Sequence, residues 1–360
     1  MILENLELRD FRSYEKVSID FDEKTNLIIG RNGQGKTNIV EALYYLSIGR
    51  SWRTDSDTPL IRMGCQNSNV RARIREGEKI TDLEVRISKD GKKVLINGKN
   101  IHRLSELYKV LNVLLFIPED TTFWKGSPSE RRSFLDVSIS KKDEAYLSSL
   151  GTYKHLLSER NALLKEENVD LLHLDVLTSQ MLDVSKPILE KRANYLSALE
   201  ETLTKLTERL FGSKRQIKLV YRPFLPLDDK FLIEGKNAYK KCLEIDLARK
   251  STSIGLHRED FRLLLDAKDV GLYCSQGENR LTAIALKLSP YFLIGENDKK
   301  PIVVLDDVYS ELDETYANNL SELLKELGQT FITSVNTELA DASYIEVSDH
   351  KAYRRSQYGK

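Results

Sequence analysis

An eight-residue glycine-rich loop sets the strongest limit on the fold of this chain. Gly30–Thr37 matches the pattern G-x-x-x-x-G-K-[ST] at every fixed position. The apolar run Leu27–Ile29 before it is typical of a buried strand, and the apolar spacing after Lys36 is typical of a helix. Because strand, loop and helix in this order form the usual context of a phosphate-binding loop, the sequence predicts an α/β fold with a nucleotide site.

The residue types in this loop suit a chain of phosphates. The glycines let successive backbone N–H groups point at one anion, and the following helix adds the positive end of its dipole. We expect Lys36 to reach the β- and γ-phosphates and the Thr37 hydroxyl to ligate Mg²⁺. The residues expected to contact the nucleotide are Gly30, Arg31, Asn32, Gly33, Gln34, Gly35, Lys36, Thr37 and Asn38. The alternative is a glycine turn that merely precedes a helix.

Two acidic residues follow a second predicted buried strand. The apolar run Ile302–Leu305 leads directly into Asp306 and Asp307. This order puts a carboxylate at the carboxyl edge of a parallel sheet, where ligands bind in such folds. We expect Asp306 to hold Mg²⁺, directly or through water, and Asp307 to polarise the attacking water. With Lys36, these acids are the predicted catalytic residues; a solvated turn is the alternative.

A third motif precedes the acidic strand. Ser275-Gln276-Gly277-Glu278 opens a predicted helix over 278–294, and serine and glycine at a helix N-terminus can form a second anion-binding nest. A helix N-cap serine is the simpler interpretation. The position before the acidic strand, and Ser310–Asp313 just after that strand, favour the functional one.

These features, in this order, resemble those of the ABC-type ATPase heads, in the branch that includes the SMC proteins. The features are the glycine-rich loop, the Ser275 motif, the acidic strand and Ser310–Asp313. More narrowly, the chain resembles the RecF family of bacterial recombination mediators. The segments that carry this resemblance span nearly the whole chain and are Asn32–Asn38, Glu41–Leu46, Pro118–Asp120, Gly126–Arg132, Gly255–Asp260 and Leu305–Asp313. The family commonly has Pro-His-Arg-Asp where this chain has Leu256–Glu259, and Gln276 and Thr333–Asn336 also depart from the commonest forms.

The resemblance implies a P-loop ABC-type ATPase head, with a mixed sheet and flanking helices, and a second, mainly helical lobe. We expect residues 1–120 and 295–360 to form the ATPase lobe and residues 121–294 to form the helical lobe with the Ser275 motif. The segment between Thr37 and Ser275 has room for a compact lobe, but not for two arms of an extended coiled coil.

The resemblance also implies a mechanism. Two chains would hold two ATP molecules between them in a head-to-tail arrangement. Each ATP would contact Lys36 and Thr37 of one chain and Ser275–Gly277 of the other. Asp313 would lie across the interface. The γ-phosphate would contact both nests, so hydrolysis to ADP would loosen the homodimer. Asp307 stands where transporter-type heads carry Glu, which would suit slow turnover.

By the same resemblance, the chain is expected to be an ATP-dependent DNA clamp of recombinational repair. It would bind double-stranded DNA at single-strand gaps and, with RecR and RecO, help to load the recombinase RecA. The gap preference comes from the resemblance alone. The segments that contain Glu119, Asp120, Arg131 and Arg132 also match the family, and a structural ion-pair network is the favoured interpretation of these four residues.

DNA contacts require a local basic patch, because Lys plus Arg and Asp plus Glu balance at 55 each. The candidates are Arg50 and Arg53 after the first helix, Arg71, Arg73 and Arg75 on one face of a strand, and the basic residues of segment 205–222. Such contacts would give salt-dependent, sequence-tolerant binding. An ordinary solvated face is the alternative for each cluster.

The composition indicates a folded chain with a charge-rich surface, since 31% of the 360 residues are charged and 41% are hydrophobic. The longest nearly apolar stretch, Val110–Ile117, is too short to cross a membrane. The first residues lack a secretory pattern. Three cysteines without C-x-x-C spacing argue against zinc knuckles and disulfide frameworks, so we expect a reducing cytoplasm.

The periodicity of the remaining chain predicts strands around 2–8, 17–21, 70–117, 301–305 and 330–333, with hairpin turns at Asp90-Gly91 and Asn97-Gly98. Residues 143–212 and about 314–327 read as helical. Leucines 196, 199, 203, 206 and 210 form a seam of only two heptads, which favours a packed helical hairpin over a free coiled coil. Pro187 is expected to kink or start one of these helices.

Three other functions remain open. The energy-coupling head of a transporter is disfavoured by Ser275–Glu278, because transporter heads prefer Ser-Gly-Gly-Gln. A P-loop small-molecule kinase would explain Lys36 and Asp306 but would leave Ser275–Glu278 and Ser310–Asp313 without a role. An ATPase head that works with a nuclease has no support in the sequence, because the chain has no additional acidic metal cluster that would call for one.

Overall fold

The computed structural model describes residues 1–101, 103–295, 298–335, 338–339 and 341–355. The chain divides into two compact units. Unit 1 comprises Met1–Thr121, Thr207–Ser213 and Ile284–Lys360, and unit 2 comprises Thr122–Leu206 and Lys214–Ala283. The chain therefore leaves unit 1 and returns to it twice.

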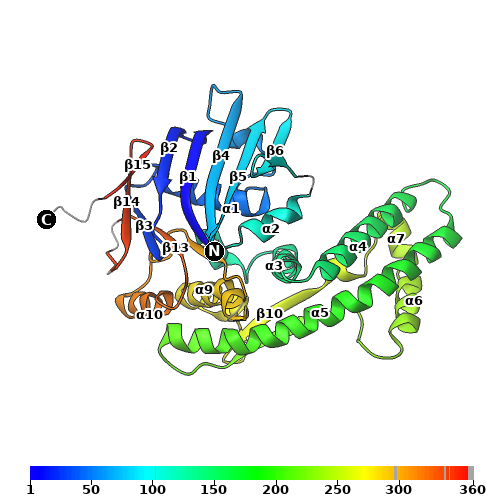
Figure 1. Ribbon diagram of the computed structural model, residues 1–360. Coiled ribbons are helices and arrows are strands. Elements are labelled where there is room, and N and C mark those ends of the chain that lie inside the picture. Colours follow the sequence, from blue (N-terminus) through cyan, green and yellow to red (C-terminus); the bar gives the residue numbers. More distant parts are fainter. Residues whose placement is uncertain (102, 296–297, 336–337, 340, 356–360) are drawn as a thin grey trace. The chain divides into compact units, whose positions relative to one another are not determined.

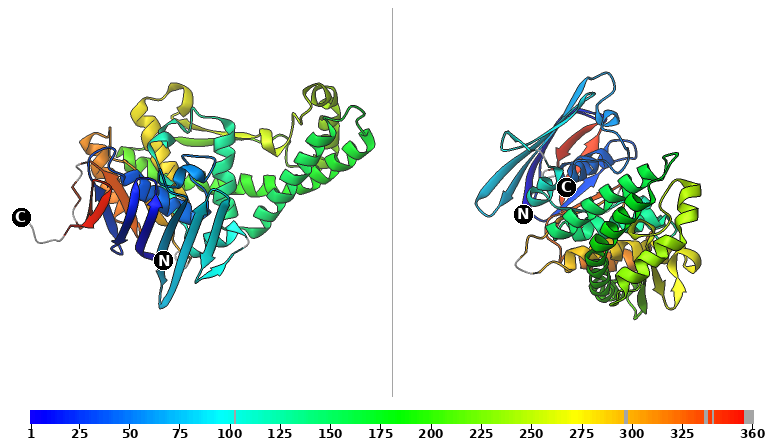
Figure 2. Two further views of the ribbon diagram at one scale, coloured as in Figure 1. Left: turned by 90° about the horizontal axis from the view of Figure 1, so that it is seen from above. Right: turned by 90° about the vertical axis from the view of Figure 1, so that its right-hand side faces the viewer.

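An antiparallel sheet forms the N-terminal part of unit 1. Its strands are β1 (Ile2–Phe11), β2 (Tyr14–Asp20), β4 (Asn67–Glu76), β5 (Lys79–Ser88), β6 (Gly91–Ile96) and β7 (Lys99–Asn100). They lie in the order β2-β1-β4-β5-β6-β7, and Figures 1 and 2 show the longer ones side by side. Along β4 and β5 every second residue is buried, as the alternation predicts for strands with one face on the core.

The two predicted hairpin turns differ in outcome. Asn97-Gly98 forms a two-residue turn in which both residues have positive φ, 50° and 77°, as a type I′ turn requires. The turn predicted at Asp90-Gly91 begins one residue earlier. Ser88 pairs with Gly91, so that Lys89-Asp90 forms the connection.

The second sheet of unit 1 is mostly parallel. Its strands are β3 (Thr25–Ile29), β8 (Val113–Phe116), β12 (Ile302–Leu305), β13 (Thr330–Ser334), β14 (Ser343–Ser348) and β15 (Lys351–Arg354). They lie in the order β15-β14-β3-β13-β12-β8, and only β15 pairs antiparallel. All four residues of β12 are buried, as its continuous apolar run predicts. The predicted α/β fold with a mixed sheet and flanking helices is confirmed.

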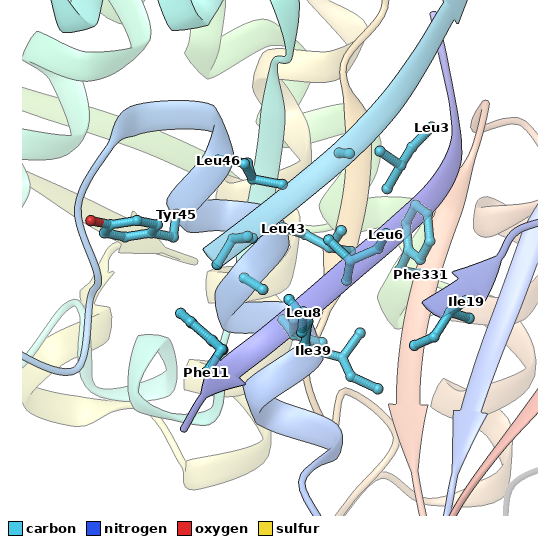
Figure 3. Close-up of a cluster of buried hydrophobic side chains, with 14 of the residues drawn as sticks. Leu3, Leu6, Leu8, Phe11, Ile19, Ile39, Leu43, Tyr45, Leu46 and Phe331 are labelled. Atoms are coloured by element: carbon cyan, nitrogen blue, oxygen red, sulfur yellow. The ribbon is translucent and has the colours of Figure 1, made fainter. Parts of the chain in front are cut away.

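The core of unit 1 joins both sheets to the helix that follows the glycine-rich loop. This helix, α1 (Lys36–Ile48), buries Ile39, Leu43 and Leu46 against residues of β1 such as Leu6 and Leu8. Figure 3 shows these side chains meeting, together with Phe331 of β13. The other helices of unit 1 are α2 (Leu107–Val110) and α10 (Glu314–Leu324).

Unit 2 is mainly helical. Its helices are α3 (Pro128–Ser140), α4 (Glu144–Leu163), α6 (Phe231–Lys241), α7 (Leu243–Arg249), α8 (Val270–Tyr273) and most of α5 (Leu171–Phe211). A small antiparallel sheet contains β9 (Ile217–Arg222), β10 (Asp260–Leu265) and β11 (Lys268–Asp269). The helix α9 (Gln276–Phe292) begins in unit 2 and ends in unit 1. Short 3₁₀ turns lie at Thr58–Leu60, Leu104–Glu106, Pro118–Thr122 and Leu256–Arg258.

The predicted helical hairpin is present as α4 and α5, which share a buried cluster that includes Tyr153 and Met181. The predicted leucine seam lies further along α5, and its five leucines are all buried. Pro187 lies inside α5, so the alternative that it starts a helix is wrong. In the part of the chain that the structure describes, every helix is too short or too polar to span a bilayer.

Two charged residues of segments 118–120 and 126–132, Asp120 and Arg131, form structural ion pairs. In unit 2, Arg131 is 2% exposed and its Nε lies 2.7 Å from Asp260 Oδ1. In unit 1, Lys287 Nζ lies 2.7 Å from Asp120 Oδ1. The predicted ion-pair network is confirmed for Arg131 and Asp120, whereas Arg132 donates to the backbone carbonyl of Glu259 (2.6 Å).

Candidate nucleotide site

The glycine-rich loop connects β3 to α1, and two of its glycines are required by their surroundings. Gly30 (φ 155°) lies so close to β14 that a Cβ atom there would meet the Val347 carbonyl oxygen at 2.3 Å. A Cβ on Gly35 (φ 107°) would meet the ring of Tyr14 at 2.9–3.1 Å. The loop therefore holds its curled backbone only with glycine at both positions. Its tip, Arg31–Gly33, is exposed.

Lys36 folds back over this loop from the first turn of α1. Its Nζ donates to the carbonyl oxygens of Gly30 (2.6 Å) and Arg31 (3.1 Å). Burial lowers the pKa of the Lys36 ammonium, and the negative charges of Asp307 and Asp306 oppose that shift. The ammonium thus lies between the loop and the two acids, where a phosphate group can accept its hydrogen bonds in place of the carbonyls.

Asp306 lies at the carboxyl end of β12 and faces two threonine hydroxyls. Its Oδ1 accepts from Thr333 Oγ1 (2.5 Å) and lies 3.3 Å from Thr37 Oγ1. Burial raises the pKa of the Asp306 carboxyl, while the bonds from Thr333 and Thr37 oppose that shift. The structure therefore brings together Thr37 and Asp306, two oxygen donors of the kind that Mg²⁺ prefers. This donor pair fits a magnesium ion.

Thr333 is a site residue that the sequence analysis missed. Its hydroxyl, at the end of β13, donates to Asp306 and accepts from the backbone N–H of Asp307 (2.9 Å). Asp307 has a φ of 49°, a left-handed conformation that is uncommon for a residue other than glycine. One hydroxyl thus fixes the carboxylate of one acid and the backbone of the next. The sequence placed Thr333 at the end of a predicted strand, but that pattern does not indicate a contact with Asp306.

The C-terminal hairpin holds the loop from the other side, and this contact was also missed. The connection between β14 and β15 is Asp349-His350, and both residues have positive φ. Gln34 Oε1 accepts from the backbone N–H of Asp349 (2.6 Å), and His350 Nδ1 lies 3.2 Å from the Gln34 carbonyl oxygen. Tyr14 donates to the Gly35 carbonyl (3.2 Å) and meets the His350 ring edge to face.

Glu41, which is fully buried in α1, organises the basic residues beside the loop. Its carboxylate accepts from Arg12 (2.5 and 2.8 Å) and from Arg53 (3.1 Å). Arg53 also donates to Asn38 Oδ1 (2.9 Å), and Asn38 donates to Ser13 Oγ (2.9 Å). The predicted DNA contact Arg53 is therefore engaged in an ion pair within unit 1, whereas Arg50 is exposed.

The Ser275 motif lies in unit 2 and forms a helix cap. Ser275 Oγ accepts from the backbone N–H of Glu278 (3.2 Å), and Glu278 Oε2 accepts from the backbone N–H of Ser275 (2.9 Å). This reciprocal pair of hydrogen bonds is a capping box. Ser275 therefore acts as the N-cap of α9, which was the simpler of the two interpretations. Ser275–Gly277 are exposed. In unit 1, Asp313 is also exposed and caps α10 through the N–H of Tyr316 (2.9 Å).

Arg71 and Arg73 lie on the outward face of β4, on the same side as predicted, and both reach one acid. Arg71 Nη2 lies 3.1 Å from Asp82 Oδ2, and Arg73 Nε lies 3.3 Å from Asp82 Oδ1. Arg75 pairs with Glu4 (2.5 Å) and with Glu23. The positive charges of these arginines are therefore partly balanced on the strand itself. Asn336 lies outside the described residues.

Comparison with known proteins identifies the family. The family model for the RecF/RecN/SMC N-terminal domain matches residues 2–352. The DNA replication and repair protein RecF of Lactobacillus johnsonii is 35% identical over 367 residues, covering 99% of this chain and 98% of that protein. The RecF of Shouchella clausii is 36% identical over 355 residues, covering 96% of this chain and 95% of that protein.

Solved structures agree with this assignment. The chain superposes on a structure of the recombination mediator protein RecF with ATP, from the RecFOR pathway, with a TM-score of 0.88 and 32% identity. The match covers 98% of this chain and 99% of that one. A Pyrococcus furiosus Smc head domain shares the fold, with a TM-score of 0.60 and 19% identity. The chain belongs to the RecF family of SMC-like, ABC-type ATPases.

Proposed function

We propose that this chain binds ATP with Mg²⁺ in unit 1 and acts as an ATP-dependent clamp on duplex DNA in recombinational repair. The observation that carries the proposal is the meeting of Lys36, Thr37 and Asp306 at one edge of a parallel sheet, beside a loop that only glycine allows. The RecF structure with ATP supports the choice of nucleotide. The RecFOR pathway of that protein supports RecO and RecR as partners. Loading of RecA is the outcome that we propose for this assembly.

Each residue would have a separate task. The backbone N–H groups of the loop and the N-terminus of α1 would hold the phosphates. Lys36 would exchange its carbonyl partners for the β- and γ-phosphates, and Thr37 and Asp306 would hold the magnesium ion. Bound Mg²⁺ supplies a positive charge that stabilises the developing negative charge on the phosphates. Asp307, held by Thr333, would orient the attacking water.

Dimerisation is the second part of the proposal. Ser275–Gly277 and Asp313 are exposed and lie at the starts of helices, where backbone N–H groups can bind an anion. A γ-phosphate held by the loop of one chain could bind the Ser275 nest of another chain. ATP would then favour the dimer and ADP would release it, because a ligand shifts an equilibrium only through its differential contacts.

The test is binding of a fluorescent gapped duplex, followed by anisotropy without nucleotide, with ADP and with a non-hydrolysable ATP analogue. Light scattering would give the mass of the same samples. We expect the analogue to cause dimerisation and tighter duplex binding. Lys36→Ala should lose both and weaken nucleotide binding by about 10- to 100-fold, since hydrogen bonds to a charged group contribute about 1.5–3 kcal/mol.

Asp307→Asn serves as the matched variant for the chemical step. It should keep analogue-dependent dimerisation and lose most ATP hydrolysis; hydrolysis at the parent rate would reject the role of Asp307. Dimerisation without DNA binding in any nucleotide state would retain the ATPase head but move the function to a transporter or another protein partner. Phosphoryl transfer to a small acceptor would favour a kinase.

A further inference from the structure

A row of basic residues crosses the outward face of the N-terminal sheet. In the pairing register, Lys16 of β2 lies opposite Arg9 of β1, and Arg9 lies opposite Asn69 of β4. Asn69 lies opposite Arg86 of β5, and Arg86 lies opposite Lys93 of β6. Residues that face each other across neighbouring strands point to the same side of the sheet. Four cations and one amide therefore form a single line across five strands.

The next row confirms which face this is. Leu8, Val70, Val85 and Val94 occupy the adjacent register positions and are all buried in the core of unit 1. Since successive side chains of a strand point to opposite faces, the basic row faces away from that core. Lys16, Arg9, Arg86 and Lys93 are all exposed.

The cations of this row differ from Arg71 and Arg73 in their pairing. Arg71 and Arg73 share Asp82 on the same face of the sheet. Among the described residues, Arg9, Lys16 and Lys93 have no carboxylate within ion-pair distance, and Arg86 pairs with its strand neighbour Glu84 (2.6 Å). Three cations of the row therefore have no ion-pair partner among the described residues.

Four of the five residues of the row, all but Lys16, also line a hollow of about 950 Å³ at one end of the sheet. Its lining includes Arg9, Asn67, Asn69, Arg86 and Lys93. Two acids line it as well, but Asp10 is already paired with Arg62 (2.8 Å), which leaves Asp90 against the cations. The Asn67 amide is a neutral hydrogen-bond donor beside the positive charges, whereas the Asn69 amide nitrogen donates to Glu84 Oε1 (3.0 Å).

We infer that this basic row, Lys16–Arg9–Asn69–Arg86–Lys93, is a contact surface for the phosphate backbone of nucleic acid. With a strand spacing of about 4.8 Å, its five strands span roughly 19 Å. This span corresponds to between about five and six base-pair steps of 3.4 Å along one DNA strand. A single small anion would meet only one or two of these cations, whereas an extended polyanion can meet all of them. The inference rests on the proposed function and assigns its DNA contacts to these residues.

Contacts with the phosphate backbone depend on charge and do not distinguish one base sequence from another. Arginine, lysine and asparagine side chains are typical donors to phosphate oxygens. Each phosphate contact releases bound counterions, so the logarithm of the affinity falls with the logarithm of the salt concentration by about 0.9 per contact. The surface therefore predicts a measurable salt slope to which individual residues contribute.

The test compares two double variants that remove the same charge from the same sheet. Arg9→Gln/Lys93→Gln changes the basic row, and Arg71→Gln/Arg73→Gln changes the arginines that share Asp82. Duplex binding of both and of the parent chain would be measured by anisotropy between 50 and 200 mM salt, with the ATP analogue present. Analogue-dependent dimerisation and thermal unfolding would be measured in parallel, because all four residues lie outside the nucleotide site.

We expect the row variant to lose about tenfold or more in duplex affinity and nearly two units of salt slope. The Arg71/Arg73 variant should stay within about threefold of the parent. Equal losses in both variants would show a response to net charge alone and would overturn the assignment, as would parent-like binding by the row variant. Failure of the parent chain itself to bind duplex would instead reject the proposed function.

Discussion

His257 is held in its neutral form by two hydrogen bonds of opposite kind. Its Nε2 lies 3.0 Å from the Thr252 carbonyl oxygen, which can only accept, so Nε2 carries the hydrogen. Its Nδ1 is then free to accept from the Tyr153 hydroxyl at 2.9 Å. Burial lowers the pKa of the His257 imidazole, and the nearby charges of Arg258 and Arg132 lower it further. His257 is thus a structural residue of unit 2.

This arrangement predicts a pH dependence of folding. The pKa of His257 is lower in the fold than the ordinary value of 6.5, so the unfolded chain binds the extra proton first. The stability that neutral His257 contributes is therefore complete above pH 6.5 and is lost as the pH falls from 6.5 toward the folded pKa. We therefore expect the free energy of unfolding of the parent chain to decrease as the pH falls below about 6.5.

The measurement is urea unfolding of the parent and of His257→Gln at several pH values. The free-energy difference between the two should shrink as the pH falls, because glutamine does not titrate. His155→Gln is the control, since His155 is exposed and pairs with Glu159 at the surface of unit 2. A difference that stays constant from pH 7 to 5 would contradict the prediction.

Among single residues, the sequence predicted those that belong to nucleotide-binding motifs. It missed the residues that position them through hydrogen bonds. The loop, Lys36, Thr37 and Asp306 could be found because their types and spacing recur wherever phosphates are held. Thr333 and the Asp349-His350 turn could not, because each acts through a contact between segments far apart in the chain. The partners of Arg71 and Arg73 depended on strand register, which alternation alone does not fix.

Among the elements, the hairpin of β14 and β15 has the most direct effect on the nucleotide site. Its Asp349-His350 turn contacts the loop through one backbone N–H and one imidazole. Changing the turn to Asn-Gly should keep the backbone bond to Gln34, because Asn-Gly is a favoured two-residue hairpin turn. The change removes the imidazole with its contacts to Gln34 and Tyr14, and it replaces the Asp349 carboxylate with an amide.

We expect this turn variant, Asp349→Asn/His350→Gly, to bind ATP about fivefold more weakly while its melting temperature stays equal or rises. One net hydrogen bond contributes about 1 kcal/mol, which corresponds to this factor. Fluorescent-nucleotide titration and thermal unfolding on one preparation would separate affinity from stability. Unchanged affinity would mean that the hairpin supports the sheet without positioning the loop.

The sequence predicted elements better than their order in the sheets. Strands with one buried face, such as β4 and β5, and the apolar strand β12 were recognisable from periodicity. The strands β14 and β15 were not predicted, since they have only six and four residues, too few for an alternation pattern to stand out. The placement of β3 between β14 and β13 depends on long-range pairing that no local pattern encodes.

At the scale of the whole molecule, the two units are interleaved along the chain. Unit 1 is assembled from three segments, and α5 and α9 each run without interruption from unit 2 into unit 1. The division into an ATPase lobe of residues 1–120 and 295–360 and a helical lobe of residues 121–294 stays a prediction. A continuous helix that spans both units loses hydrogen bonds where it enters one unit if its part in the other unit unfolds.

This interleaving predicts that both units unfold together and that a ligand of unit 1 stabilises both. The chain has two tryptophans, Trp52 in unit 1 and Trp124 in unit 2, so Trp124→Phe and Trp52→Phe leave one reporter in each unit. At 100 times its Kd, an ATP analogue should add about 2.7 kcal/mol to the free energy of unfolding. We expect the thermal unfolding midpoints of the two variants, followed by tryptophan fluorescence, to coincide and to rise by the same few degrees with the analogue. Neither midpoint should rise when Lys36→Ala is added to the variant. A shift seen only by Trp52 would show instead that unit 2 unfolds independently, and that the continuous helices α5 and α9 do not couple the units.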